Sequence, residues 1–384
     1  MPIQITPITQ WYQPMPNPLR IIIAGGGTGG HIFPAIAVAQ AIQQLQPNAA
    51  ILFVGANGKM EMDKVPQAGF EIKGLTIAGF NRTNILKNIT LPFKLVKSFV
   101  QVSAIFKKFK PNAVFGVGGY SSFPVLKYAQ TKNIPTFIHE SNAFAGKSNK
   151  LLGINATKIF TGTTGMERFF PADKIQVSGN PVRENIVNNL YTKEAALLKF
   201  GLLPDRKTLL IVGGSLGAAS INGAIKENLS VFADKGFQLI WQTGKPNAQD
   251  YVNAVEQYSN VYVSSFIDDM SAAYAAADFV ISRSGAMAVA EISIANKPCL
   301  FVPYPFAAED HQTFNAMSLV KEGAAIMIQD KDVKQALTNT IIELLDNENA
   351  IELMKKKLTA FAVLDADRII AREIIQSVEN SKLK

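Results

Sequence analysis

Cysteine is almost absent from this chain of 384 residues, since Cys299 is the only one. No disulfide can form within one chain, which excludes the disulfide-stapled secreted folds. The apolar run CLFVP around Cys299 predicts a buried structural thiol. Histidine is scarce as well, at positions 31, 139 and 311, and no Cys and His residues have the spacing of a zinc site.

Long hydrophobic runs are also missing. No apolar stretch reaches the roughly 18–20 residues that a membrane-spanning helix needs, so we expect any membrane contact to be peripheral. Residues 1–18 are rich in proline and lack the early positive charge and the apolar core of a signal peptide, and we interpret them as an extension. The net charge of +8 implies an anionic partner: nucleic acid, an anionic lipid leaflet and a phosphorylated substrate all fit it.

What the chain does contain is an alternation of apolar, β-branched runs with segments of helical periodicity. Hydrophobic residues make up 48% and charged residues 18%, as in globular α/β proteins, and the length fits two domains of about 150–200 residues each. Runs that end in Gly, Pro, Asp or Asn predict parallel strands joined by crossover helices. The expected strands are 20–24, 50–55, 113–117, 136–139, 158–161 and about 174–178 in the first half, and 208–212, 238–242, 261–264, 279–282, 299–302 and 325–328 in the second.

Two segments resemble each other across the halves. IIIAGGGTGGH at 21–31 and LLIVGGSLGAAS at 209–220 each predict a strand that runs into glycines and then a helix. Between them we expect a linker at about 181–207. Open α/β sheets bind ligands outside the carboxyl ends of their strands, so both glycine loops should face a cleft between two domains.

The first glycine loop predicts a site for an anionic ligand. Gly25, Gly27 and Gly30 satisfy G-x-G-x-x-G, but the ribose-binding acid of a dinucleotide site is missing, because nothing acidic follows the second strand until Glu61. A P-loop is excluded, since His31 stands where its lysine would be. The amides at the helix start should face an anion. His31 is then placed to remove a proton from an attacking hydroxyl, with local capping or packing as the alternative.

The second glycine loop and the run after it predict a nucleotide site. GGSLG at 213–217 places Ser215 and free amides at a helix start, where a diphosphate can bind. In FVISRSGAMAVAE, residues 279–291, Arg283 ends a strand and Glu291 lies about two turns into the next helix. We expect Arg283 to contact pyrophosphate or the base and Glu291 to accept the ribose hydroxyls, whereas a surface pairing of the two is the alternative.

Seven motifs, in this order along the chain, are typical of one family. They are GGGTGGH at 25–31, GVGGYSSFP at 116–124, HESNAFAGKSNK at 139–150, GNPVR at 179–183, GGSLGA at 213–218, FIDDM at 266–270 and SRSGAMAVAE at 282–291. Over about residues 19–375 the sequence resembles the MurG family of N-acetylglucosaminyltransferases. The resemblance implies the α/β fold called GT-B, with two Rossmann-like domains whose parallel sheets face an interdomain cleft.

The resemblance also implies an activity and a division of labour. It is the inverting transfer of N-acetylglucosamine from UDP-N-acetylglucosamine to the 4-hydroxyl of the muramyl sugar in a lipid-linked muramyl-pentapeptide, for peptidoglycan synthesis. The implied domains are an acceptor and membrane-side domain at 19–182, a UDP-sugar domain at 183–361, and a C-terminal helix at 362–384 that packs back on the first domain. Proteins of cell-wall synthesis and cell division are the implied protein partners.

By motif position, the resemblance assigns site residues. It makes His31 the base, leaving phosphate binding or acceptor positioning open for the same residue. It implies Tyr120 and Glu140 as further catalytic residues, in the acceptor-side loops. The sequence departs from the family pattern at Ser141 and His311, where glutamines are expected. The implied donor-site residues are Thr28, Gly29, Gly30, Asn142, Arg183, Ser215, Ile267, whose backbone would meet uracil, Arg283, Ala286, Glu291 and Gln312.

A basic, apolar segment in the first half predicts a membrane-facing surface. Residues 72–110 carry eight Lys or Arg and no acidic residue, with Leu, Ile and Phe interleaved. Such a face binds anionic lipid at the headgroup boundary, and the family resemblance implies that the lipid surface is the cytoplasmic face of the inner membrane. An ordinary packed helix with a solvated face is the alternative. Nucleic acid is not expected, because no recognition-helix or zinc signature occurs. The residues expected at the membrane are Phe80, Arg82, Lys87, Phe93, Lys94 and Lys97.

We expect neither a metal nor a cofactor. Inversion in one displacement needs a base and charge stabilisation for the departing UDP, and Asp268 and Asp269 precede a helix that they are expected to cap. Three other readings stay open on the sequence. They are a GT-B transferase with a diacylglycerol-type acceptor, a UDP-sugar epimerase, and a non-catalytic UDP-sugar sensor or membrane scaffold.

Overall fold

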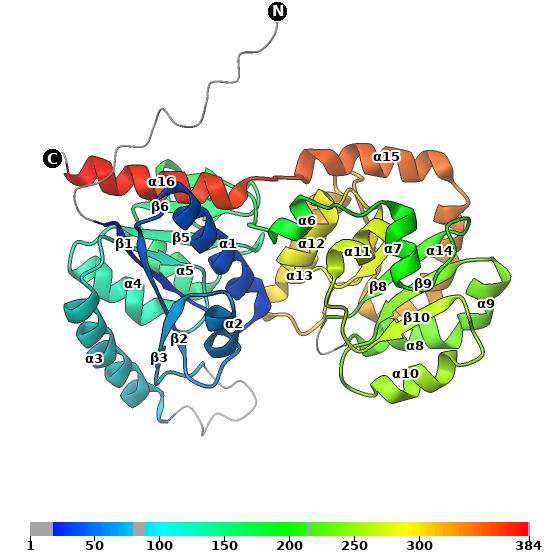
Figure 1. The fold of residues 1–384 in the computed structure, drawn as a ribbon, viewed down its shortest axis with the longest axis horizontal. Coiled ribbons are helices and arrows are strands. Elements are labelled where there is room, and N and C mark those ends of the chain that lie inside the picture. Colours follow the sequence, from blue (N-terminus) through cyan, green and yellow to red (C-terminus); the bar gives the residue numbers. More distant parts are fainter. Residues whose placement is uncertain (1–17, 80–88, 215–216, 383–384) are drawn as a thin grey trace, which may run out of the picture.

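The chain forms two α/β domains, each built on one parallel sheet (Figure 1). The computed structural model describes residues 18–79, 89–214 and 217–382. The first sheet has, in spatial order, β3 (Glu71–Leu75), β2 (Ala50–Ala56), β1 (Arg20–Ala24), β4 (Ala113–Gly116), β5 (Thr136–Glu140), β6 (Lys158–Thr161) and β7 (Ile175–Val177). The second has β10 (Val261–Ser264), β9 (Gln238–Gln242), β8 (Thr208–Val212), β11 (Phe279–Ser282), β12 (Cys299–Phe301) and β13 (Ile326–Met327).

All strand pairs in both sheets are parallel over the residues that the structure describes. The chain reverses its direction of travel across the sheet beside β1 in the first domain and beside β8 in the second. These are the switch points at which open sheets bind ligands. The predicted GT-B fold class is confirmed, and each of the twelve expected strands is present within one or two residues.

Helices join these strands in both domains. Those of the first domain are α1 (Gly29–Leu45), α2 (Glu61–Gln67), α3 (Leu91–Phe109), α4 (Ser122–Thr131), α5 (Lys147–Gly153) and the C-terminal α16 (Ala366–Lys382). Those of the second are α6 (Glu184–Val187), α7 (Lys193–Lys199), α8 (Ala219–Glu227), α9 (Leu229–Asp234), α10 (Ala248–Val255), α11 (Met270–Ala276), α12 (Ala286–Ile294), α13 (His311–Val320), α14 (Val333–Leu345) and α15 (Glu348–Leu358). Short 3-10 turns lie at Met166–Arg168, Ala172–Lys174, Ala308–Asp310, Asp330–Asp332 and Thr359–Phe361.

Strand β3 was not among the expected strands. Its first four residues alternate between exposed and half-buried sites, and only the last, Leu75, is buried, as suits a strand at the edge of a sheet. Sequence reasoning placed residues 72–75 in the membrane-facing segment, and this part is wrong, because Leu75 is fully buried. Gly74 and Lys73 obscured the strand, since both residue types are depleted in strands.

The segment expected to be a linker at 181–207 is instead part of the second domain. It contains α6 and α7, and α7 packs against α11 with Ala196 and Leu197 fully buried. Thr192 caps α7 by accepting the backbone N–H of Ala195. The crossing between the domains is therefore short, and it lies near Gly179 and Asn180.

The chain crosses between the domains a second time before α16. This helix lies along α1 (Figure 1) and buries Ile370, Ile374 and Val378 in the core of the first domain. The two crossings touch, because a Cβ placed on Gly179 would meet the side chain of Val363. Gly179 also has a φ of 75°, which favours glycine.

Candidate active site

Two glycine-rich turns interlock at the carboxyl end of the first sheet. The backbone N–H of Gly26 donates to the carbonyl of Gly118 at 3.2 Å. A Cβ on Gly25 or on Gly119 would collide with the backbone of the opposite turn. Both turns need glycine for this close approach, and they leave the start of α1 open.

Glu61, at the start of α2, stabilises the first glycine turn by accepting its backbone N–H. Its side chain is 1% exposed, and its two oxygens accept the backbone N–H of Gly27 at 2.8 Å and that of Ala56 at 3.0 Å. Sequence reasoning noted Glu61 only as an acid that comes too late to bind a ribose. The structure shows that this acid supports the turn.

His31 lies at the start of α1, where its imidazole is held in one tautomer. Nδ1 is 3.2 Å from the carbonyl oxygen of Gly26, which can only accept, so Nδ1 carries the proton. Nε2 is left with its lone pair and lies beside Gly118, whose missing side chain makes room for the ring. Burial lowers the pKa of His31 below its usual value, against the opposing influence of Glu140. The imidazole is therefore neutral at pH 7 and able to accept a proton.

Thr28, Gly29 and Gly30 form the entrance to α1. Thr28 is exposed at the helix N-cap, and its hydroxyl lies 3.3 Å from Nδ1 of His31. A Cβ placed on Gly30 would lie 4.0 Å from the side chain of Met287 in the second domain. The first glycine loop and the start of α12 thus meet across the domain boundary.

Glu140 organises the loop after β5. One of its oxygens accepts from the backbone and the side-chain amide of Asn142, at 3.1 and 3.3 Å. The other accepts from the backbone of Gly146 at 3.1 Å and from the amide of Asn149 at 2.8 Å. With both oxygens engaged and 4% of the residue exposed, Glu140 is placed to shape this loop.

Tyr120 and His139 differ in exposure and in what they contact. Tyr120 is 52% exposed, and its ring occupies the space above Gly79. His139 is fully buried and bonds to the carbonyl of Gly179 at 3.2 Å, and burial lowers its pKa to about 4. His139 is thus a neutral structural residue near the domain crossing.

Glu291, on α12, is the centre of the donor-side cluster. Its carboxylate accepts from Nη2 of Arg183 at 3.2 Å and from the hydroxyl of Tyr274 at 3.2 Å. Burial raises the pKa of Glu291 above its usual value, and Arg183 opposes this shift. The guanidinium of Arg183 also lies 5.4 Å from the ring centroid of Phe33 in the first domain. Arg183 therefore links the expected ribose-binding carboxylate to the helix that carries His31.

Arg283 comes directly after the last residue of β11, close to its expected place at the strand end, and its guanidinium is bound to its own domain. It pairs with Asp330 at 2.5 Å and donates to the carbonyls of Val302 and Pro303, each at 3.1 Å, and to the hydroxyl of Ser220 at 3.2 Å. The surface pairing of Arg283 with Glu291, which was the alternative at this position, does not occur. In this structure Arg283 braces the turn between β11 and α12.

The other expected donor residues lie around the same edge of the second sheet. The backbone N–H of Ile267 donates to Gln242 at 3.0 Å. Gln312 accepts the backbone N–H of Tyr304 at 2.9 Å, and its carbonyl receives the hydroxyl of Ser284 at 2.8 Å. Ala286 begins α12, so its amide is at the positive end of that helix. Ser215 lies outside the described residues.

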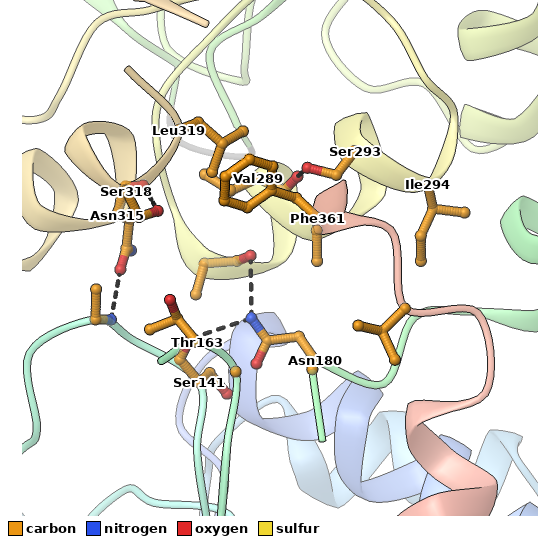
Figure 2. Close-up of a pocket in the computed structure, with 16 residues that line it drawn as sticks. Ser141, Thr163, Asn180, Val289, Ser293, Ile294, Asn315, Ser318, Leu319 and Phe361 are labelled. Carbon is orange, nitrogen blue, oxygen red and sulfur yellow. Dashed lines mark hydrogen bonds between the residues drawn. The ribbon is translucent and has the colours of Figure 1, made fainter. Parts of the chain in front are cut away.

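Asparagine amides tie the two domains together beside these clusters. Asn315 accepts the backbone N–H of Ala143 at 2.8 Å and donates to the carbonyl of Ser284 at 3.1 Å. Asn180 donates to the carbonyls of Ser141 and Ala286, at 3.1 and 3.4 Å. Figure 2 shows both amides reaching across the boundary, around a cavity of about 50 Å³. Sequence reasoning missed Asn315, because a single asparagine in a helix carries no motif.

A metal site is not seen in the part of the chain that the structure describes, where no group of three or more His, Cys, Asp or Glu residues could hold an ion. Asp269 caps α11, as expected, by accepting the backbone N–H of Ala272 at 3.1 Å. Cys299 is fully buried, and burial raises the pKa of its thiol. The expectation of a structural cysteine is confirmed.

Helix α3 presents an apolar, basic face to solvent. Phe93 is 77% exposed, and Val96 and Val100 are each 66% exposed on the same side of the helix. Lys97 is also exposed, and Lys94 is half-buried. Phe80, Arg82 and Lys87, expected at the same surface, lie outside the described residues. Within the described ranges, the helices are all too short or too polar to cross a membrane.

Comparison with known proteins finds relatives along almost the whole chain. Residues 21–161 match the glycosyltransferase family 28 N-terminal domain and residues 208–369 match the glycosyltransferase family 28 C-terminal domain. A relative in Phocaeicola vulgatus, named UDP-N-acetylglucosamine--N-acetylmuramyl-(pentapeptide) pyrophosphoryl-undecaprenol N-acetylglucosamine transferase, is 49% identical over 94% of this chain and 97% of its own length. A relative of the same name in Bacteroides thetaiotaomicron is 47% identical over 95% and 99%. Among solved structures, Acinetobacter baumannii MurG is 28% identical with a TM-score of 0.76, covering 94% of this chain and all of that one.

Proposed function

The chain belongs to the MurG family within glycosyltransferase family 28, and on that premise we propose how its residues carry out the reaction for which its relatives are named. It transfers N-acetylglucosamine from UDP-N-acetylglucosamine to the muramyl sugar of undecaprenyl-pyrophosphoryl-muramyl-pentapeptide. The attacking group is the 4-hydroxyl of that sugar, and the anomeric carbon is inverted in a single displacement.

The observation that carries this mechanism is the tautomer of His31. A carbonyl acceptor at Nδ1 leaves the lone pair on Nε2, and a lowered pKa keeps it available at neutral pH. No hydrogen bond joins Nε2 to any residue in the described ranges. Nε2 takes the proton of the 4-hydroxyl as its oxygen attacks the anomeric carbon, a role for which a pKa near or below the working pH suits a base.

The departing UDP needs stabilisation of its developing negative charge. The amides at the start of α12, beginning at Ala286, and those of the glycine loop at 28–30 supply the positive ends of two helices that meet at the domain boundary. Ser215 adds a hydroxyl to the second glycine loop. No metal is needed for this stabilisation.

Arg183 completes the donor site through an exchange of partners. Its bond to Glu291 occupies the carboxylate that the ribose hydroxyls would use. When the ribose binds Glu291, the guanidinium is released toward the diphosphate. Ile267 and Gln312 then bind uracil and the donor sugar, and Arg283 supports the turn that positions these groups.

The acceptor is a lipid, and the exposed face of α3 suits a lipid surface. Phe93, Val96 and Val100 would enter the headgroup boundary, while Lys94 and Lys97 attract anionic lipid. The enzyme is thus a peripheral protein of the cytoplasmic face of the inner membrane. Proteins of cell-wall synthesis and division would meet it there.

The test of the reaction is transfer of radiolabelled N-acetylglucosamine from UDP to a synthetic muramyl-pentapeptide-pyrophosphoryl lipid. We expect product with the unchanged enzyme, and a loss of about 100-fold or more in turnover for His31→Ala, with UDP affinity within about 3-fold. Glu291→Gln is the matched donor-site variant, and it should lose UDP affinity. An enzyme that binds UDP but makes no disaccharide lipid would have another acceptor.

The test of the membrane surface is binding to vesicles that contain anionic lipid. Reversing Lys94, Lys97 and Lys107 to glutamate should weaken binding by at least about 100-fold, since each cation near the surface contributes about 1 kcal/mol. Reversing Lys226, Lys321 and Lys334 of the second domain changes the net charge equally and serves as the control. Equal losses in both triple variants would remove α3 from the proposal.

A further inference from the structure

A second pocket opens in the donor domain. None of its lining residues is assigned above to the donor or acceptor site, although one of them, Tyr274, bonds to Glu291. Its volume is about 390 Å³, within the range of small-molecule sites. It lies between the segment 186–193, helix α11 and the end of α12. The polar groups that line it are Asn189, Tyr191, Lys193, Ser271, Tyr274 and Lys297.

The charge around this pocket is positive. Lys193 and Lys297 line it, and no acidic residue is among its described lining residues. Asp278 pairs with Lys193 at 2.5 Å and accepts the backbone N–H of Thr208 at 2.8 Å with its other oxygen. Asp269 and Glu291, which accept from Tyr191 and Tyr274, are each balanced by a cation of their own, Lys199 and Arg183. Lys355 repels Lys297 from α15. Lys355 has its own partner in Glu352 at 2.7 Å, so Lys193 and Lys297 share the carboxylate of Asp278, which leaves an excess positive charge of about one.

The hydrogen-bonding groups favour an anion as well. Lys297 has three N–H donors, and within the described residues one bond is seen, to the carbonyl of Ala277 at 2.8 Å. The side-chain oxygen of Asn189 already accepts the backbone N–H of Tyr191 at 3.0 Å and lies 3.0 Å from the hydroxyl of Ser271. The amide N–H groups of Asn189 are therefore the part of its side chain that can donate to a bound anion.

The ammonium of Lys297 is poorly solvated. Burial lowers its pKa to about 8, against the attraction of Asp278 and with the repulsion of Lys193 and Lys355. A bound anion would compensate this charge and raise the pKa of Lys297 again. Anion binding near pH 8 should therefore take up protons.

The pocket shares wall residues with the surroundings of Glu291 in the donor site. Tyr274 lines it and donates to Glu291 at 3.2 Å. Ile294 and Ala295 line it too, and the backbone N–H of Ala295 donates to the carbonyl of Glu291 at 2.9 Å. A ligand in the pocket thus contacts two elements that position the carboxylate.

We propose that this pocket binds a small dianion, such as a phosphate monoester, on Lys193 and Lys297, and that its occupancy changes the affinity of the enzyme for its uridine nucleotide. The second part rests on the proposed role of Glu291 in ribose binding. Two ammonium groups with spare donors match a phosphate monoester, which carries nearly two negative charges at pH 7. A dicarboxylate has the same charge and is an arm of the test.

The first experiment reads the site without using activity. The full enzyme is labelled with an amine-reactive reagent at pH 7.5, and each lysine is followed by peptide mass spectrometry. Inorganic phosphate, malonate and chloride are compared at constant ionic strength. We expect phosphate to slow labelling of Lys297 at least about 5-fold relative to chloride, with exposed Lys334 as the internal reference. Equal labelling of Lys297 in phosphate and chloride overturns the proposed site, and stronger protection by malonate overturns the phosphate assignment.

The second experiment measures the coupling. The dissociation constant of UDP is compared with and without phosphate in the unchanged enzyme, in Lys297→Met and in Lys193→Gln. Phosphate can also compete at the diphosphate site, but that competition remains in both variants. We expect a further change of about 5-fold or more only in the unchanged enzyme. An equal change in all three proteins overturns the coupling, and neither experiment depends on the identity of the sugar acceptor.

Tyr274→Phe separates the site from its connection to Glu291. The ring stays in the wall of the pocket, but the hydroxyl that bonds to Glu291 is lost. Protection of Lys297 by phosphate should persist while the effect of phosphate on UDP affinity disappears. An effect of phosphate on UDP affinity that persists in this variant contradicts the proposed route through Tyr274. Lys297→Arg, which keeps the charge, should retain both effects.

Discussion

Replacing Glu61 by glutamine tests the support beneath the first glycine loop. The carboxylate accepts two backbone N–H groups, from Gly27 and Ala56, at a site that is 1% exposed. Glutamine keeps the shape, but its amide N–H₂ must face one of these N–H groups, so that one bond is lost and one donor is left buried. A lost hydrogen bond to a charged group with an orphaned donor costs about 2–3 kcal/mol.

The assay is thermal unfolding followed by circular dichroism, together with transfer activity. For a domain of this size, about 2–3 kcal/mol lowers the first apparent midpoint by roughly 4–12 °C. Asp63→Asn removes the same charge from an exposed site on the same helix and should shift the midpoint by less than about 1 °C. Turnover should fall, because the loop that carries His31 and the amides at 28–30 loosens. A Glu61→Gln enzyme with wild-type midpoint and turnover would refute this role.

Three further predictions follow from the site. The value of kcat/KM should fall as the pH drops through a pKa below 6.5, because His31 must be neutral to act as a base and burial lowers its pKa. A pH profile of transfer, with His31→Ala alongside, checks this. The free energy of unfolding should decrease by about 3 kcal/mol between pH 6.5 and pH 4, because His139 takes up a proton in this range in the unfolded chain but not in the folded one. Denaturant titrations of the parent enzyme at both pH values measure this decrease. The His139→Gln variant, which lacks this titrating group, should not show it. UDP affinity should be unchanged in EDTA, since amides, hydroxyls and arginine bind the donor; full loss of calorimetrically measured binding would contradict that account.

Pattern and motif in the sequence were enough to predict the two sheets. The core strands are continuous apolar runs because both faces of a parallel sheet are covered by helices, and such runs are easy to recognise. Edge strand β3 was not predicted, because its five residues do not form a continuous apolar run and include Lys73 and Gly74. The helices α6 and α7 were taken for a linker because they are short and polar, and their burial depends on α11, which lies far along the chain.

The candidate site was predictable where a motif has a local cause. A glycine turn, a histidine at a helix start and an acid two turns into a helix are all set by neighbours in the sequence. The supports were not predictable, because their partners are distant: Glu61 lies 34 positions from Gly27, and Asn315 lies 172 positions from Ala143. For Arg283, the end of the strand was predicted correctly, but nothing in the sequence indicated Asp330 as its partner.

Helix α16 has a consequence for the order in which the protein can be made. The first domain lacks Ile370, Ile374 and Val378 until the last residues of the chain have been synthesised. The whole donor domain, about 180 residues, is translated in between, which takes on the order of ten to forty seconds at bacterial rates of elongation. During that time the flank of α1 that α16 will cover remains bare on the ribosome. A chain released a few codons early would carry a complete nucleotide domain beside an unfinished acceptor domain, so a premature stop near the end should damage the acceptor domain first.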